Sequence, residues 1–399
     1  MRVLFTPLPV GSHLYHQVSL AWAFRAAGHE VRVASQASLT KTTLSTGLTA
    51  VEVGDDYDFM ASMAAMPESH RISAAALMVM SEDERRAMGQ RRSGPLIELN
   101  QRLAPDLLRF AEEWRPDLLV TDPTLFAAPL VSAVLGIPII RNIWGPDIIF
   151  GHPLQGQPNT GAEREQWHPG LVELFDRYGA EVRNDYITQT VDPWPASLRT
   201  FGAANPLPRR YVAYNGAGAA PDWILKRSGK PRVCVTWGTT TSVLGGHSAL
   251  LPRVVDALAP LDIELVVTVS STDRASLTGL PDNVRVVENL PLNLLMPSCD
   301  AIVNQGGTGS VLTAAAAGVP QVLVPEISEA PTNAISFTAS GASVLLEPAE
   351  LTAEAVTAAV TAVLTDDTIR KSADRIREEI AAMPSPASVV STVEALVAA

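Results

Sequence analysis

The sequence predicts an α/β protein of two domains, and three observations support this fold class. Short apolar segments alternate with helical segments along most of the chain, a pattern typical of parallel sheets covered by helices. The 399 residues exceed what one hydrophobic core usually supports. The alternation stops between residues 203 and 221, where prolines and glycines cluster. We therefore expect a first domain at 1–205, a second at 206–372, and C-terminal helices at 373–399 that cross back to the first domain.

The first domain begins with a strand, a helix and a second strand. Residues 2–6 have three apolar residues at their centre and predict a buried strand. Residues 13–27 predict a helix, which Gly28 ends, and residues 31–34 predict the next strand. A unit this short implies that the two strands are parallel and that the helix covers one face of their sheet.

The rest of the first domain follows the same pattern less regularly. Further strands are expected at 49–53, at 118–121 and from 138, and helices at 60–90, at 96–114 with a kink at Pro105, and up to 135. The segment 60–90 is rich in methionine, for which ordinary helix packing is the simpler explanation and a pocket for an apolar ligand the alternative. Residues 150–166 predict a long loop, which is typical of a segment that serves a site.

The second domain repeats the alternation after the linker. Strands are expected at 232–237, 263–269, 284–287, 301–303 and 321–324, with helices near 251–258 and at 311–317. Residues 365–399 predict helices that are broken at Pro384 and Pro386.

Composition excludes several classes of protein. A formal charge of -12 argues against a nucleic-acid partner, which requires a basic face. No apolar run approaches the length of a membrane span, and the N-terminus lacks the apolar core of a signal peptide. Cys234 and Cys299 lie in apolar contexts, which is typical of core thiols in a reducing compartment. We therefore expect a cytoplasmic protein with no membrane partner.

The stretch 304–310 has the composition of a phosphate-binding turn. It reads Asn-Gln-Gly-Gly-Thr-Gly-Ser and joins a short strand to an alanine-rich helix. Three of its residues have no Cβ and allow a sharp turn close to a ligand, namely Gly306, Gly307 and Gly309. Helix-terminal amides, the helix dipole and the hydroxyls of Thr308 and Ser310 suit a phosphate or diphosphate. The alternative is a turn whose glycines serve geometry alone.

A second loop of similar composition follows the strand at 232–237. It opens with Gly238, Thr239 and Thr240. Two such loops in one parallel domain indicate a site that holds both ends of a nucleotide diphosphate. The glycine fingerprint of dinucleotide-binding domains is missing, because the first loop of the chain offers only Gly11. This absence argues against an NAD enzyme.

His13 and Asp122 are the candidate acid–base pair. Each follows a predicted strand, and ligands of open α/β sheets bind beyond the carboxyl ends of strands. A carboxylate that holds one imidazole nitrogen makes the other a better general base. The alternative for His13 is a helix-start residue that bonds the backbone. His16, on the same helix face, suggests a metal pair, but no third ligand has suitable spacing, so we expect no metal site.

Several separate motifs, in order along the chain, carry a resemblance to a known family. They are Ser12-His13-Leu14, residues 116–122, residues 211–216, residues 235–239, residues 305–310, and residues 377–380 with Met383-Pro384. Together they resemble the GT-B fold natural-product glycosyltransferases of family 1, in particular the actinobacterial enzymes that use dTDP-deoxysugars. The resemblance covers nearly the whole length of the chain.

The resemblance implies two Rossmann-like domains that face a cleft, with the acceptor bound by the first domain and the donor by the second. It implies that His13 deprotonates the acceptor, that Asp122 orients His13, and that the sugar inverts at its anomeric carbon without a metal or another cofactor. Asp147 is a further acid–base candidate, with a plain turn carboxylate as the alternative. The implied donor-binding residues are Gly238, Thr239, Thr240, Gln305, Gly306, Gly307, Thr308, Gly309, Ser310, Glu329 and Asn333.

The chain departs from the family pattern at three positions. Gln305 stands where the family usually has histidine, and glutamine can donate a hydrogen bond to phosphate but cannot become cationic. Glu329-Ala330 stands where the family has the Asp-Gln pair that grips sugar hydroxyls, which fits a donor with fewer hydroxyls. His16 replaces the usual proline three residues after the catalytic histidine.

The leading hypothesis is an inverting transferase that moves a deoxysugar from a dTDP carrier to an apolar, polyketide-type acceptor. A non-catalytic or regulatory homologue is the second hypothesis, on account of Gln305, and a nucleotide-sugar epimerase is the third. The expected partners are the small-molecule acceptor and the nucleotide-sugar donor, and a homodimer is an open possibility.

Overall fold

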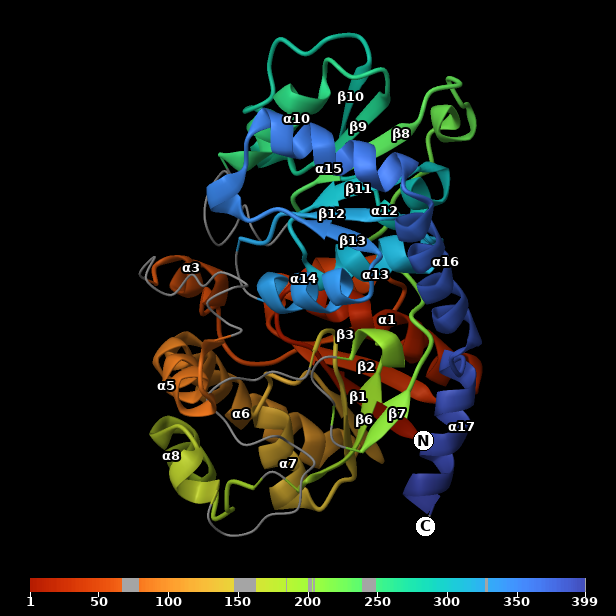
Figure 1. The fold of residues 1–399 in the computed structure, drawn as a ribbon. Coiled ribbons are helices and arrows are strands. Elements are labelled where there is room, and N and C mark those ends of the chain that lie inside the picture. Colours follow the sequence, from red (N-terminus) through yellow and green to blue (C-terminus); the bar gives the residue numbers. More distant parts are fainter. Residues whose placement is uncertain are drawn as a thin grey trace.

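The computed structural model describes residues 1–66, 79–146, 163–183, 185–199, 203, 205–238, 249–326 and 329–398. The chain forms two α/β domains, each built around one parallel sheet, as predicted. Figure 1 shows the second domain above the first, with two C-terminal helices along one side of both.

The first domain has a seven-stranded sheet in the order β3-β2-β1-β4-β5-β6-β7, with every neighbouring pair parallel. Its strands are β1 (Arg2–Thr6), β2 (Glu30–Ser35), β3 (Thr49–Glu52), β4 (Leu118–Thr121), β5 (Ile139–Asn142), β6 (Ile187–Asp192) and β7 (Pro206–Pro208). Thr6 at the end of β1 pairs with Thr121 at the end of β4. This register brings the residues that follow the two strands to the same edge of the sheet.

Helices cover both faces of this sheet, and each face has its own apolar core. They are α1 (Gly11–Ala26), α2 (Thr40–Ser45), α3 (Phe59–Ala64), α5 (Glu82–Arg92), α6 (Gly94–Trp114), α7 (Ala127–Leu135) and α8 (Pro169–Arg177), with short 3₁₀ turns at Ala37–Leu39, Glu163–Gln166 and Ala196–Leu198. Met60 and Met63 pack against one of these cores, which supports the simpler explanation for that segment. Met78 lies outside the described residues.

The second domain has a six-stranded parallel sheet in the order β10-β9-β8-β11-β12-β13. Its strands are β8 (Arg232–Thr236), β9 (Glu264–Val269), β10 (Val284–Glu288), β11 (Ala301–Asn304), β12 (Gln321–Leu323) and β13 (Ser343–Leu345). Thr236 pairs with Asn304. The loops after β8 and β11, which are the two candidate phosphate loops, are therefore neighbours.

The helices of this part of the chain are α10 (Leu250–Leu258), α11 (Ser271–Arg274), α12 (Leu292–Leu295), α13 (Thr308–Ala317), α14 (Ala330–Ala339), α15 (Ala353–Thr365), α16 (Asp367–Ala382) and α17 (Pro386–Ala398), with 3₁₀ turns at Asp222–Leu225, Met296–Ser298 and Pro348–Glu350. α13 begins three residues earlier than predicted, so Thr308, Gly309 and Ser310 form its first turn. Cys234 is buried and Cys299 half-buried, and neither forms a disulfide.

The domain limits differ in detail from the prediction. β7 pairs with β6, so the first sheet extends beyond the predicted boundary after residue 205. The second boundary, at 372, falls inside α16, which still packs against α13 of the second domain. The helix that crosses back is α17, which contacts α1 (Figure 1).

Among the described residues, no single helix is long and apolar enough to span a membrane. The bent pair α16 and α17 meets both criteria only when the two helices are taken together.

Candidate active site between the two domains

His13 and Asp122, the candidate acid–base pair, lie within hydrogen-bonding distance of each other. His13 lies in the first turn of α1, and Asp122 directly follows β4. His13 Nδ1 and Asp122 Oδ2 are 2.7 Å apart. The other oxygen, Asp122 Oδ1, accepts hydrogen bonds from the backbone N–H and the hydroxyl of Thr124, at 2.9 and 2.6 Å. Both carboxylate oxygens are thus bonded, which fixes the orientation of a fully buried side chain.

The environment of His13 favours its protonated form. Burial alone lowers the pKa of His13, but the Asp122 carboxylate, and more weakly that of Glu329, outweigh burial and raise the pKa above 6.5. For Asp122, burial raises the pKa, and the contacts with His13 and Thr124 lower it below its ordinary value. Asp122 therefore remains ionised and holds the His13 Nδ1–H. Nε2 is left as the ring nitrogen that can accept a proton.

Trp144 fixes the other side of His13. The two rings meet edge to face, with centroids 4.9 Å apart. The next residue, Gly145, approaches the second domain so closely that a Cβ there would lie 3.2 Å from Thr308 Oγ1. The segment after β5 therefore connects the His13 side of the site to the first turn of α13. Asp147, the further acid–base candidate, lies outside the described residues.

The first candidate phosphate loop depends on its glycines. Gly306 has φ +83°, and a Cβ there would lie 3.1 Å from the carbonyl oxygen of Ala330. Asn304 supports the turn, since its side chain accepts a hydrogen bond from the Gly306 N–H at 2.8 Å. α13 then begins after Gly307, which has no side chain to cap the helix, so the first turn of α13 is a candidate anion site.

Gln305 joins the two candidate loops. Its side chain is buried against Gly238 on one side and Gly307 on the other. A Cβ at Gly238 would collide with Gln305 Nε2, and one at Gly307 would lie 2.8 Å from the same atom. Gln305 Oε1 is buried without a partner. The adjacency predicted for the two loops is present, while Thr239 and Thr240 lie outside the described residues.

Glu329 and Asn333 both contact the first turn of α13. Glu329 Oε1 accepts from the N–H and the hydroxyl of Thr308, both at 3.3 Å. Asn333 is fully buried, and its Nδ2 donates to the Gly306 carbonyl at 2.8 Å and to Thr308 Oγ1 at 3.0 Å. Asn333 therefore stabilises the turn at Gly306 and Thr308 through its hydrogen bonds. The Glu329 carboxylate lies at the N-terminal, positive end of α13.

Two buried residues of the linker, Arg209 and Tyr211, contact the helices of the site and were not predicted as part of it. Arg209 donates to the His16 carbonyl at 3.1 Å and to the Ser19 hydroxyl at 2.6 Å. The Tyr211 hydroxyl lies 3.1 Å from Thr313 Oγ1, so the linker is bonded to both α1 and α13. The sequence signal was present, because residues 211–216 form one of the family motifs, but the bonds depend on how the two domains meet.

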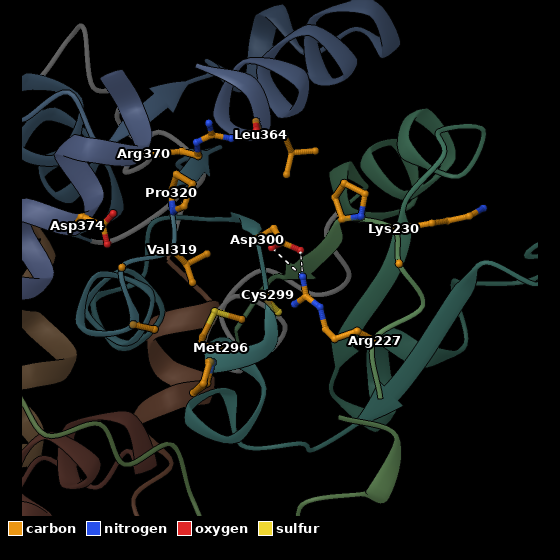
Figure 2. Close-up of a pocket in the computed structure, with 15 residues that line it drawn as sticks. Arg227, Lys230, Met296, Cys299, Asp300, Val319, Pro320, Leu364, Arg370 and Asp374 are labelled. Atoms are coloured by element: carbon orange, nitrogen blue, oxygen red, sulfur yellow. Dashed lines mark hydrogen bonds and ion pairs between the residues drawn. The ribbon is translucent and has the colours of Figure 1, made fainter. Parts of the chain in front are cut away.

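A surface cavity of about 520 Å³ lies elsewhere, at the opposite edge of the second sheet (Figure 2). It is lined by residues that precede β8, β11 and β12, such as Pro231, Asp300 and Pro320. Its cationic Arg227 is paired with Asp300, as the dashed lines in Figure 2 mark. Ligands of open α/β sheets bind at the carboxyl ends of strands, so this cavity is separate from the candidate site.

In the part of the chain that the structure describes, no group of three or more His, Cys, Asp or Glu side chains is arranged to hold a metal ion.

Comparisons with known proteins agree with this geometry. Residues 22–238 match the N-terminal domain of the family described as Erythromycin biosynthesis protein CIII-like, and residues 252–396 match its C-terminal domain. The 10-deoxymethynolide desosaminyltransferase of Streptomyces venezuelae is 38% identical over 100% of this chain and 97% of its own length. The 3-alpha-mycarosylerythronolide B desosaminyl transferase of Saccharopolyspora erythraea is 34% identical over 100% and 99%.

Solved structures resemble the chain over its full length. The spinosyn forosaminyltransferase SpnP superposes with a TM-score of 0.82 at 32% identity, covering 100% of both chains. The glycosyltransferase VinC in complex with dTDP gives 0.84 at 29% identity, covering 100% of this chain and 99% of its own. The fold and the site therefore define a GT-B glycosyltransferase of the natural-product type. Within that class, the chain belongs to the Erythromycin biosynthesis protein CIII-like family.

Proposed function

We propose that this glycosyltransferase moves a deoxysugar from a dTDP carrier to an apolar, polyketide-type acceptor, with inversion at the anomeric carbon. The observation that carries the proposal is the His13–Asp122 pair, joined through Trp144 and Gly145 to the first turn of α13. A direct displacement requires a base for the acceptor and an anion site for the leaving group, and here the two would face each other across the boundary between the domains.

The relatives support the choice of substrates. They are named as transferases of desosamine, mycaminose and mycarose to macrolide-type compounds. One structural neighbour, the spinosyn rhamnosyltransferase SpnG, is known both with thymidine diphosphate and with the spinosyn aglycone. The same two ligand classes suit a chain that these proteins match over nearly its whole length.

In the proposed reaction, His13 Nε2 takes the proton of the acceptor nucleophile as that atom attacks the anomeric carbon. The bond from this carbon to the diphosphate oxygen breaks, and the oxygen keeps the electron pair. Asp122 stabilises the imidazolium that forms on His13. A single displacement inverts the anomeric carbon.

The leaving diphosphate is stabilised by groups of the second domain. The first-turn amides of α13 and the hydroxyls of Thr308 and Ser310 are placed to bind its oxygens. Gln305 adds an amide group from the turn itself. These donors supply the charge stabilisation without a metal ion. Glu329, at the same helix end, is proposed to move to the sugar hydroxyls when the donor displaces it from Thr308.

The test is turnover of a dTDP-deoxysugar with a macrolide aglycone, followed by NMR of the anomeric configuration in the product. We expect an inverted product, and a loss of rate of about 100-fold or more in His13→Ala. A matched control is His168→Asn, which removes an imidazole that caps α8 while keeping a side chain suited to that position. Retained configuration, isomerised sugar without acceptor, or dTDP binding without turnover would each contradict the proposal.

A further inference from the structure

His16 has no role in the reaction as described so far. It lies one turn after His13 on α1 and is 6% exposed. Its Nδ1 is buried without a partner. Its Nε2 is directed at the second domain, since it lies 3.9 Å from the position that a Cβ of Gly309 would take. A buried imidazole of the first domain therefore reaches the first turn of α13.

The contacts around His16 hold it in this place. Its backbone carbonyl accepts a hydrogen bond from Arg209, which is itself buried and also bonded to Ser19. Its ring lies beside Tyr211, with centroids 5.9 Å apart, and the Tyr211 hydroxyl contacts Thr313 on α13. The backbone and the ring are thus both fixed by residues of the linker.

The first turn of α13 is otherwise poor in positive charge. Gln305 is neutral, and Glu329 adds a negative charge to the same turn. A leaving diphosphate gains negative charge as its bond to the sugar breaks, so a further donor there stabilises the transition state more than the ground state. Two described side chains have a nitrogen 3.9 Å from the position that a Cβ of Gly309 would take, namely Asn215 and His16, and His16 is the one that α1 contributes.

We propose that His16 Nε2 donates a hydrogen bond to the diphosphate of the sugar donor, and that this bond strengthens as the diphosphate leaves. The inference rests on the proposed function and adds a donor-binding residue from the acceptor-binding domain. In this arrangement the diphosphate is bound by α1 of the first domain and by α13 of the second, so it bridges the two domains.

The protonation state of His16 is consistent with this role. Burial, together with the charges of His13 and Arg209, lowers the pKa of His16 to about 3, so the ring is neutral near pH 7. A neutral imidazole has one N–H. A buried N–H without an acceptor is rarer than a buried acceptor without a donor, so the proton belongs on Nε2 rather than on the unpartnered Nδ1.

The experiment is isothermal titration calorimetry of the full-length protein with thymidine diphosphate and, separately, with thymidine. His16→Phe keeps an aromatic ring but removes both nitrogens, and His16→Ala avoids any overpacking. We expect both variants to bind thymidine diphosphate about tenfold or more weakly than the wild type. Thymidine affinity should stay within about twofold, and kcat at saturating donor should also fall. His168→Asn, the control of the turnover test, should change neither affinity.

Three outcomes would contradict the proposed role of His16. Unchanged affinity for thymidine diphosphate in both variants overturns the inference, as does a parallel loss of thymidine affinity, which indicates a packing role. A loss of diphosphate affinity with unchanged kcat overturns the part that concerns the leaving group. If the wild type itself binds no thymidine diphosphate, the proposed function fails, and that failure is visible before any variant is made.

Discussion

At the scale of single residues, the site depends on which group holds which proton. Asp122 is fully buried, bonded through both oxygens, and ionised because of His13 and Thr124. His13 carries a raised pKa because of the same carboxylate. The two residues thus titrate as a coupled pair, and removing the charge of one changes the pKa of the other.

Asp122→Asn tests this coupling through the pH profile. His13 must be neutral to accept a proton, so kcat/KM should rise as the pH increases through the raised pKa of His13 and level off above it. Without the carboxylate, burial remains and lowers that pKa, so the acidic limb should move to lower pH. The plateau should fall about 100-fold or more, because the imidazolium loses its partner. An acidic limb that does not move assigns it to another group.

Glu329→Gln tests the carboxylate at the end of α13. In the structure without ligand it accepts from the N–H and hydroxyl of Thr308, where a phosphate oxygen would bind. Neutralising it should tighten thymidine diphosphate binding by about threefold to tenfold, because a like charge is removed from the anion site. Calorimetry measures the change, with the exposed Glu350→Gln as the control. Weaker binding of the diphosphate would show that Glu329 does not compete for this position.

At the scale of elements, the side chain of Gln305 lies between the two candidate phosphate loops, against Gly238 and Gly307. Gly307 has an ordinary φ of -63°, and the atom that a Cβ there would crowd is Nε2 of the buried Gln305, at 2.8 Å. Gly307→Ala should therefore lower the free energy of unfolding by about 1 to 2 kcal/mol. The same substitution in a Gln305→Ala background should cost close to nothing. Denaturant unfolding of the four proteins measures the coupling, and additive effects would contradict it.

The elements that the sequence could predict are those with strong apolar patterns. β1, β4, β8 and β11 are almost entirely buried runs, and the residues that follow each neighbouring pair of strands lie at the same edge of their sheet. β6, β7 and β13 were not predicted. β6 has only two apolar residues, Ile187 and Val191, with three polar residues between them. β7 is three residues with two prolines, and β13 is also three residues.

The site itself was predictable only within each domain. His13 and Asp122 could be paired because both follow strands of one sheet, and the two loops because both belong to the other. The contact of Gly145 with Thr308, and that of His16 with Gly309, cross from one domain to the other. No local pattern encodes such contacts, since they depend on the linker and on α17. From the sequence, His16 was accordingly considered only as one half of a metal pair and as a replacement for the usual proline of the family.

At the scale of the whole molecule, α17 links the two domains a second time. It follows α16, which packs on the second domain, and it contributes Val389, Val390 and Val393 to the core that contains α1. Glu394 on the same helix bonds His29 at 2.8 Å. Because α1 carries His13 and His16, the helix that closes the chain also supports the acid–base side of the site (Figure 1).

Val393→Asp tests this support. Val393 is fully buried, so an unpaired carboxylate there should lower the free energy of unfolding by about 3 kcal/mol or more. Leu396→Asp places the same group on an exposed part of the same helix and should have little effect. Because α17 packs on α1, which carries His13, Val393→Asp should reduce turnover well below the melting temperature while thymidine affinity remains. Equal stability of the two variants, measured by thermal and denaturant unfolding, would mean that α17 rests on the first domain without stabilising it.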